Sequence, residues 1–85
     1  MIGYDFTSQA ERMFLKLPKD VRARIIHKIE HYLRQPNPLI FAKRIVGSPV
    51  ASYRFQIGDY RVIFDWEDNN ILITKVGHRR EVYRG

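Results

Sequence analysis

The chain has 85 residues and a formal net charge of +6, and 45% of its residues are hydrophobic. A chain this short buries one modest core, which excludes a second domain and an enclosed active-site cavity and predicts a single domain over residues 1–85. The absence of cysteine excludes disulfide bonds and thiolate metal sites, and no apolar stretch approaches the roughly 20 residues that span a bilayer.

The positive charge resides mainly in arginine, which makes up ten of the fifteen basic residues. Arginine presents a planar, permanently charged fork that binds two phosphate oxygens at once, whereas lysine is a point charge. A polyanion such as a nucleic acid is therefore a natural partner, although a basic surface without a ligand has the same composition. The first residues lack the basic start and unbroken apolar run of a secretory signal peptide, so we expect a cytoplasmic protein.

The first half of the chain predicts one strand followed by two helices. Residues 2–6 alternate between apolar and small or polar side chains, which is typical of a short strand. In residues 8–17 a capping-box pattern that starts at Ser8 precedes one apolar helical stripe, and Pro18 ends it. A second amphipathic helix is predicted over residues 19–35, so that the two helices form a hairpin.

The second half begins with a long connection and is then strand-like. Residues 36–50 hold three of the four prolines and are expected to form the connection. Residues 51–57 and 60–66 alternate between apolar and polar side chains around a Gly58–Asp59 turn, and residues 71–76 predict a third strand. A short basic tail follows.

This order of elements predicts an α+β fold, β-α-α-β-β-β. The helical hairpin should pack on one face of a small, mainly antiparallel sheet, because the sheet offers the only apolar surface large enough for both helices. The aromatic side of the strands is expected to take the helices. The opposite side then carries Arg54, Gln56 and Arg61 toward solvent, as a shallow floor lined with arginine.

Basic side chains near an aromatic ring form the candidate site. Arg54 and Arg61 lie on either side of one hairpin turn, and Arg79 and Arg80 follow the neighbouring strand closely enough to reach the same edge. Tyr83 adds a ring with an ionisable hydroxyl. Such a set suits RNA, whose phosphates are clamped while unstacked bases lie on flat side chains. Ordinary surface salt bridges with nearby acids are the alternative explanation.

Three segments resemble one known family. Residues 52–64, SYRFQIGDYRVIF, are similar to the hallmark hairpin of the RelE/ParE superfamily of toxins. Residues 76–83, VGHRREVY, resemble the C-terminal signature of its RelE branch, and residues 14–22, FLKLPKDVR, resemble its helix junction. The likeness covers nearly the whole chain in the same order.

The resemblance implies a toxin of a type II toxin–antitoxin system that cleaves mRNA in the ribosomal A site and that a RelB-like antitoxin holds inactive. Cleavage would transfer the phosphate to the RNA's own 2′-hydroxyl, without a metal or any other cofactor. Carried over by motif, Arg61 would stabilise the transition state and Arg79 would act as an acid or charge stabiliser. Arg54 would hold the phosphate, and Tyr83 would stack on or orient the cleaved nucleotide. Further RNA contacts are assigned to Lys43, Arg44, Arg80 and Gln56.

Gln56 departs from the family pattern. The family often has a lysine or arginine here, which is the proposed general base in some members, whereas a neutral amide cannot take up a proton. Either the base lies elsewhere, with His78, Asp59 and Glu81 as the available groups, or catalysis relies on positioning and charge alone. Histidine exchanges protons most readily near neutral pH, yet a histidine in a basic tail is as often a plain RNA contact.

Two other functions fit the same sequence. The ParE branch shares the fold but poisons DNA gyrase by binding, which does not need a phosphate clamp of arginines. A non-catalytic RNA-binding or antitoxin-paired module that has lost its base is the other alternative, and Gln56 keeps it open.

Two features lie outside the basic site. His27 and His31 have a spacing that can chelate zinc on a helix, but no third ligand stands beside them, so we expect no metal site. Apolar residues also exceed what one small core needs and predict an exposed patch that an antitoxin helix would cover. They are Ile26, Leu39, Ile40 and Phe41.

Overall fold

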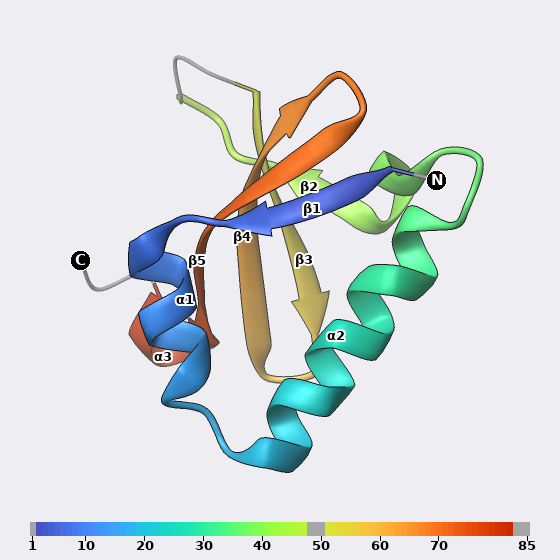
Figure 1. The fold of residues 1–85 in the computed structure, drawn as a ribbon. Coiled ribbons are helices and arrows are strands. Elements are labelled where there is room, and N and C mark those ends of the chain that lie inside the picture. The colour runs from blue at the N-terminus through green and yellow to red at the C-terminus, as the bar shows by residue number, and fades with distance from the viewer. Residues whose placement is uncertain (1, 48–50, 83–85) are drawn as a thin grey trace.

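The computed structural model describes residues 2–47 and 51–82, which form a sheet with helices against it (Figure 1). The strands are β1 (Gly3–Phe6), β2 (Ala42–Arg44), β3 (Ser52–Ile57), β4 (Tyr60–Glu67) and β5 (Asn70–His78). The helices are α1 (Ser8–Leu15), α2 (Lys19–Leu33), the short 3-10 helix η1 (Pro38–Phe41) and α3 (Arg79–Val82). The predicted α+β fold is confirmed, and η1, β2 and α3 are additions to it.

The five strands are arranged in the order β1-β5-β4-β3-β2. The pair β1–β5 is parallel and the other three pairs are antiparallel, so the first strand of the chain lies beside the last. The expectation that residues 36–50 form a plain connection is wrong for β2. A three-residue edge strand is too short to show the alternation by which strands are recognised.

The core lies between the two long helices and one face of the sheet. The helices α1 and α2 diverge from the turn at Pro18 as a V, and each lies against this face (Figure 1). Ile25 and Ile29 of α2 are fully buried there, as are Phe55 of β3 and Phe64 of β4, whose rings are 4.6 Å apart. Burial of this apolar surface is the main force that stabilises the fold.

Thr7, rather than Ser8, is the N-cap of α1. The Thr7 hydroxyl oxygen accepts a hydrogen bond from the backbone N–H of Ala10 at 3.1 Å. The predicted cap was therefore displaced by one residue, because threonine and serine stand side by side here and both are favourable N-caps. Among the described residues, no helix combines the length and the apolar character that crossing a membrane requires.

Regular pairing breaks once, between β4 and β5. Ile73 pairs with Phe64, but Ile63 pairs with Lys75 rather than with Thr74. Thr74 is thus the extra residue of a β-bulge, and its hydroxyl donates to the carbonyl oxygen of Ile63 at 3.3 Å. Since a bulge shifts the alternation of the residues that follow it, Lys75 lies on the side of the sheet opposite the core.

Candidate functional site

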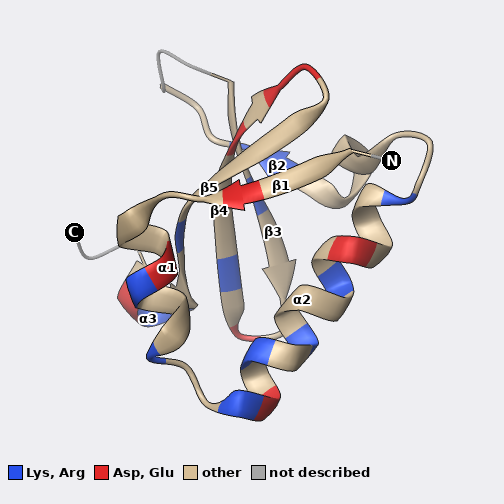
Figure 2. Ribbon diagram, viewed as in Figure 1, with Lys and Arg blue, Asp and Glu red and all other residues tan. Residues whose placement is uncertain are grey.

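The face of the sheet opposite α1 and α2, the open face, carries most of the predicted site. In the β3–β4 ladder Gln56 pairs with Arg61 and Arg54 pairs with Ile63, while Lys43 of β2 pairs with Arg54. Cross-strand partners share a face, so the structure brings these side chains together as predicted. Basic residues occur on each of the strands β2 to β5 (Figure 2).

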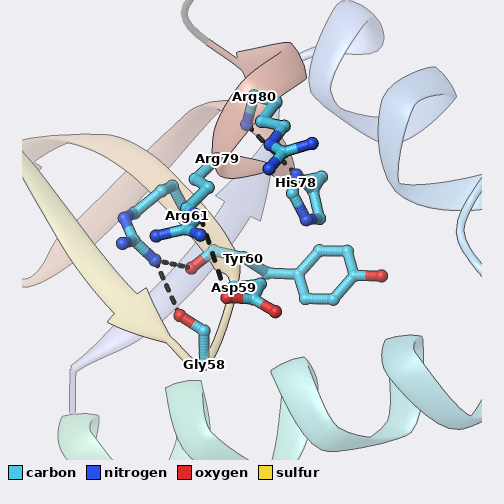
Figure 3. Close-up of polar contacts among 7 residues, drawn as sticks. All are labelled: Gly58, Asp59, Tyr60, Arg61, His78, Arg79 and Arg80. Atoms are coloured by element: carbon cyan, nitrogen blue, oxygen red, sulfur yellow. Dashed lines mark hydrogen bonds and ion pairs between the residues drawn. The ribbon is translucent and has the colours of Figure 1, made fainter.

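Arg61 is held by the backbone of the β3–β4 turn. Its Nη1 donates to the carbonyl oxygen of Gly58 at 2.8 Å and to that of Tyr60 at 2.9 Å (Figure 3). Gly58 has a φ of +61°, the positive value that a two-residue hairpin with glycine first requires. Neutral carbonyl groups therefore fix the guanidinium in place and leave its positive charge uncompensated.

Arg79, the first residue of α3, is tied to the same turn. Its backbone N–H donates to the carbonyl oxygen of Asp59 at 2.7 Å, and its Nε lies 3.8 Å from Asp59 Oδ1. The two side chains are 53% and 67% exposed, so solvent screens this ion pair and makes it weak. The backbone hydrogen bond positions the start of α3, while the guanidinium is free to turn toward a ligand (Figure 3).

Arg54 is placed by packing. Its side chain is half-buried, and its Nε is buried without a hydrogen-bond partner. Within the described part of the chain, the pair of Arg79 with Asp59 is the one ion pair. Arg54 and Arg61 therefore keep their charges available to an anion.

Two acids on the open face, Asp65 and Asp5, are engaged by polar neighbours. Asp65 pairs with the buried Ser52 across β3 and β4, and its Oδ1 accepts a hydrogen bond from the Ser52 hydroxyl at 2.6 Å. Asp5 on β1 accepts from the side-chain amide of Asn70 at 3.1 Å. These contacts hold the carboxylates toward the end of the sheet away from the β3–β4 turn.

His78 is already committed to a hydrogen bond. Its Nδ1 accepts a hydrogen bond from the backbone N–H of Arg80 at 3.1 Å. The Tyr60 and His78 rings pack edge to face, with their centres 5.6 Å apart. A neutral histidine with Nδ1 as acceptor carries its proton on Nε2, so no lone pair is left to take up a second proton. In this arrangement His78 is poorly suited to act as a general base.

Not every predicted site residue reaches the open face. Arg44 pairs with Tyr53, and its guanidinium lies 5.8 Å from the centre of that ring, on the helix-covered side. Tyr83 lies outside the described residues. Lys75 also reaches the open face, although it was not among the predicted site residues. Strict alternation along the third predicted strand would have grouped it with the core residues of β5, so no sequence signal pointed to it.

The predicted apolar patch is divided between surface and core. Ile40 is 69% exposed and Phe41 is 38% exposed, whereas Leu39 packs against the core and Ile26 is half-buried. The Phe41 ring stacks on Tyr32 with the ring centres 4.7 Å apart. Only η1 therefore presents strongly exposed apolar side chains from the predicted set.

Two further histidines stand on α2. His27 and His31 are both exposed on the outer surface of that helix. Among residues 2–47 and 51–82, no group of three or more histidine, aspartate and glutamate side chains is placed to hold a metal ion.

Comparison with known families decides the affiliation of the chain. The family model of the ParE toxin of type II toxin–antitoxin systems, parDE, matches residues 4–83. The chain belongs to this family. It is thus a type II toxin of the RelE/ParE superfamily, as the sequence resemblance predicted. A comparison of the sequence with curated proteins gave no match.

Solved structures of RelE proteins resemble this toxin. A chain of the toxin–antitoxin complex RelBE2 from Mycobacterium tuberculosis is 25% identical with a TM-score of 0.80, over 92% of this chain and 98% of that one. A chain of the RelE–RelB complex from Pyrococcus horikoshii is 27% identical with a TM-score of 0.70, over 94% and 97%. The isolated RelE toxin of E. coli, 22% identical with a TM-score of 0.74 over 92% and 84%, shares the fold.

Proposed function

We propose that this toxin is a ribosome-dependent mRNA endonuclease of the RelE type, which cuts mRNA in the ribosomal A site and so inhibits translation in the cytoplasm. The observation that carries the proposal is the gathering of Arg54, Arg61 and Arg79 from β3, β4 and α3 at one end of the open face. Among the residues that the structure describes, two of the three have no acidic partner, and the third has only a weak one. Such a concentration of uncompensated guanidinium groups favours a phosphate ligand.

The proposed reaction uses the RNA's own nucleophile. The 2′-oxygen of one nucleotide attacks the adjacent phosphorus and loses its proton, and the bond from phosphorus to the 5′-oxygen of the next nucleotide breaks. That oxygen takes up a proton, which leaves a 2′,3′-cyclic phosphate and a 5′-hydroxyl. The phosphorane transition state carries additional negative charge, and cations fixed in advance lower its free energy without having to reorganise.

The geometry gives each arginine a distinct part in this reaction. Arg61, held by two carbonyl oxygens, is preorganised to stabilise charge on the phosphorane. Arg79, which is loosely paired and exposed, is free to move to the leaving 5′-oxygen, while Arg54 holds the phosphate. Lys43 extends the cationic surface along the RNA. We retain Tyr83 as the residue that stacks on the cleaved nucleotide.

The proposed mechanism does not depend on an assigned general base. Gln56 cannot accept a proton, and the Nδ1 of His78 is occupied. We therefore assign most of the rate enhancement to positioning and charge stabilisation. In this proposal, guanidinium groups take the role that metal ions have in many other nucleases.

We also propose a RelB-like antitoxin as the partner that keeps the toxin inactive. Two of the structures that resemble this chain are complexes of RelE with RelB. The exposed side chains of Ile40 and Phe41 beside the edge strand β2 offer an apolar contact of the kind that a partner helix covers.

Primer extension on mRNA held in translating ribosomes tests the proposed cleavage. Wild-type toxin should give discrete cuts in the A site that fade in Arg61→Ala and Arg79→Ala, while free RNA stays intact. Arg44→Ala is the matched control, because it removes the same charge from the helix-covered side of the sheet and should leave the cuts unchanged. Active, antitoxin-free toxin that cuts no mRNA would refute the proposal.

Gyrase inhibition is the second candidate function. The family model that matches residues 4–83 is that of the ParE toxin, and the ParE branch poisons DNA gyrase. A supercoiling assay with purified gyrase distinguishes the two functions. If the toxin blocks supercoiling, and Arg61→Ala and Arg79→Ala block it equally well, the ParE function replaces the endonuclease.

A further inference from the structure

Lys75 occupies a place in the cationic surface that the β-bulge creates. Because Thr74 is the extra residue, Lys75 pairs with Ile63 and lies on the open face. Lys43 pairs with Arg54, and Arg54 pairs with Ile63. Cross-strand pairing therefore aligns four residues on the strands β2 to β5, and all of them except the one on β4 are basic. They are Lys43, Arg54, Ile63 and Lys75.

Ile63, the exception, lies at the centre of a cationic cluster formed by Arg54, Arg61 and Lys75. Arg54 and Lys75 flank it on the two neighbouring strands, about 10 Å apart at their Cα atoms, which is two inter-strand spacings. Arg61 lies two residues away on β4, on the same face as Ile63. Arg54 and Lys75 thus flank one half-buried apolar residue and are long enough to converge above it, while the Arg61 guanidinium is held at the turn end of the same face by the carbonyl oxygens of Gly58 and Tyr60.

The positive charges of this cationic cluster are not balanced by acidic side chains among the described residues. In the described part of the chain, neither Lys75 nor Arg54 has an acid within ion-pair distance, and Asp65 on the same face takes its hydrogen bond from Ser52. On the β3 side of Arg61 stands the neutral Gln56. On its β5 side Arg61 pairs with Gly77, so neither partner of Arg61 is charged, and Lys75 adds a cation on β5 at the next pair of residues on the same face.

We infer that Lys75 and Arg54 bind an RNA phosphate above Ile63, beside Arg61 on the same face. The inference rests on the proposed endonuclease function for the identity of the ligand, single-stranded RNA. Lysine acts there as a point charge, so the contact depends on the positive charge and tolerates arginine. Its ammonium attracts the phosphate in the ground state and the phosphorane charge in the transition state.

A binding experiment tests this contact without requiring cleavage. A fluorescent 2′-O-methyl RNA oligonucleotide, which has no nucleophilic hydroxyl, is titrated with toxin at several salt concentrations. Lys75→Met keeps the unbranched stem and removes the charge, so it should reduce the slope of log K against log salt by about 0.7, the value for one phosphate contact with a single strand. Lys75→Arg should restore the slope. Lys28→Met, which removes the same charge from the exposed side of α2, should leave the slope at its wild-type value.

Cleavage provides the second measurement. In single-turnover assays on translating ribosomes, Lys75→Met should lower the rate at saturating toxin about tenfold, which is less than the roughly 100-fold minimum for removing a donor fixed against the transition state. Lys75→Arg should recover most of the rate, and Lys28→Met should match wild type. Thermal unfolding of each variant verifies that it is folded.

The outcomes separate this inference from the proposed function. A slope that is unchanged in Lys75→Met, or reduced equally in Lys28→Met, overturns the role of Lys75 whatever the cleavage assay gives. A reduced slope restored by arginine supports the phosphate contact. If the wild-type toxin cuts no mRNA, the endonuclease fails, and the slopes still decide whether Lys75 binds phosphate.

Discussion

Replacing Asp59 with asparagine separates two roles of this carboxylate, a tether for Arg79 and a general base. The ion pair spans 3.8 Å between side chains that are both more than half exposed, so its loss should cost less than about 1 kcal/mol. For a domain of this size that cost lowers Tm by less than about 4–8 °C. The backbone hydrogen bond between Arg79 N–H and the Asp59 carbonyl oxygen is unaffected, so α3 should stay in place.

Cleavage of ribosome-bound mRNA then reports on the chemistry. If Asp59 only tethers Arg79, the rate of Asp59→Asn should stay within about fivefold of wild type, the equivalent of 1 kcal/mol. If Asp59 is the general base, the rate should fall by about 100-fold or more. Asp68→Asn, which alters an exposed acid beyond the end of β4, controls for net charge. A loss of 100-fold or more in folded Asp59→Asn protein, with Asp68→Asn active, would show that the tether interpretation is wrong.

Three further predictions concern the contacts that hold the sheet and its helices. Ser52→Ala removes the 2.6 Å hydrogen bond to Asp65 and should lower the free energy of unfolding by about 1.5–3 kcal/mol, as for a bond to a charged group; a urea midpoint equal to that of wild type would contradict this. Phe64→Ala opens a cavity in the fully buried core and should cost about 3–5 kcal/mol in urea unfolding; a loss below about 1 kcal/mol would mean that the core repacks freely. Burial raises the pKa of Tyr4, and its hydrogen bond to Glu30 with the charge of that carboxylate raises the pKa further. Because the folded pKa is the higher one, this stabilisation is complete below about pH 10 and is lost as the pH rises through the folded pKa. The stability difference between wild type and Tyr4→Phe should therefore shrink in urea titrations above pH 10, and a difference that does not depend on pH would argue against it.

The fold and the arginines of the open face could be predicted because both follow from the alternation of apolar and polar residues along the strands. In residues 52–57 and 60–66 apolar and polar side chains alternate, with Ile63 as the one exception, and the ladder between β3 and β4 keeps this register throughout. Period-two patterning alone therefore assigned Arg54, Gln56 and Arg61 to one face. The turn at Gly58 could also be predicted, because the positive φ of this position favours glycine.

Features that depend on irregular backbone or on distant partners could not be predicted. The β-bulge at Thr74 reverses the alternation of the residues after it, so Lys75 would have been assigned to the core. The strand β2 exists because β3 offers it a free edge, and nothing within its own three residues encodes that. The hydrogen bond that occupies His78 depends on the turn into α3, which a basic tail does not reveal.

The parallel pairing of β1 with β5 has a consequence for how the toxin is made. During synthesis the first strand leaves the ribosome long before its partner, and the edge it forms stays open until nearly the whole chain has emerged. The hairpins from β3 to β5 are local and assemble quickly, whereas joining the two ends of the chain has high contact order and is slow. We therefore expect docking of β1 against β5 to be the last step of folding.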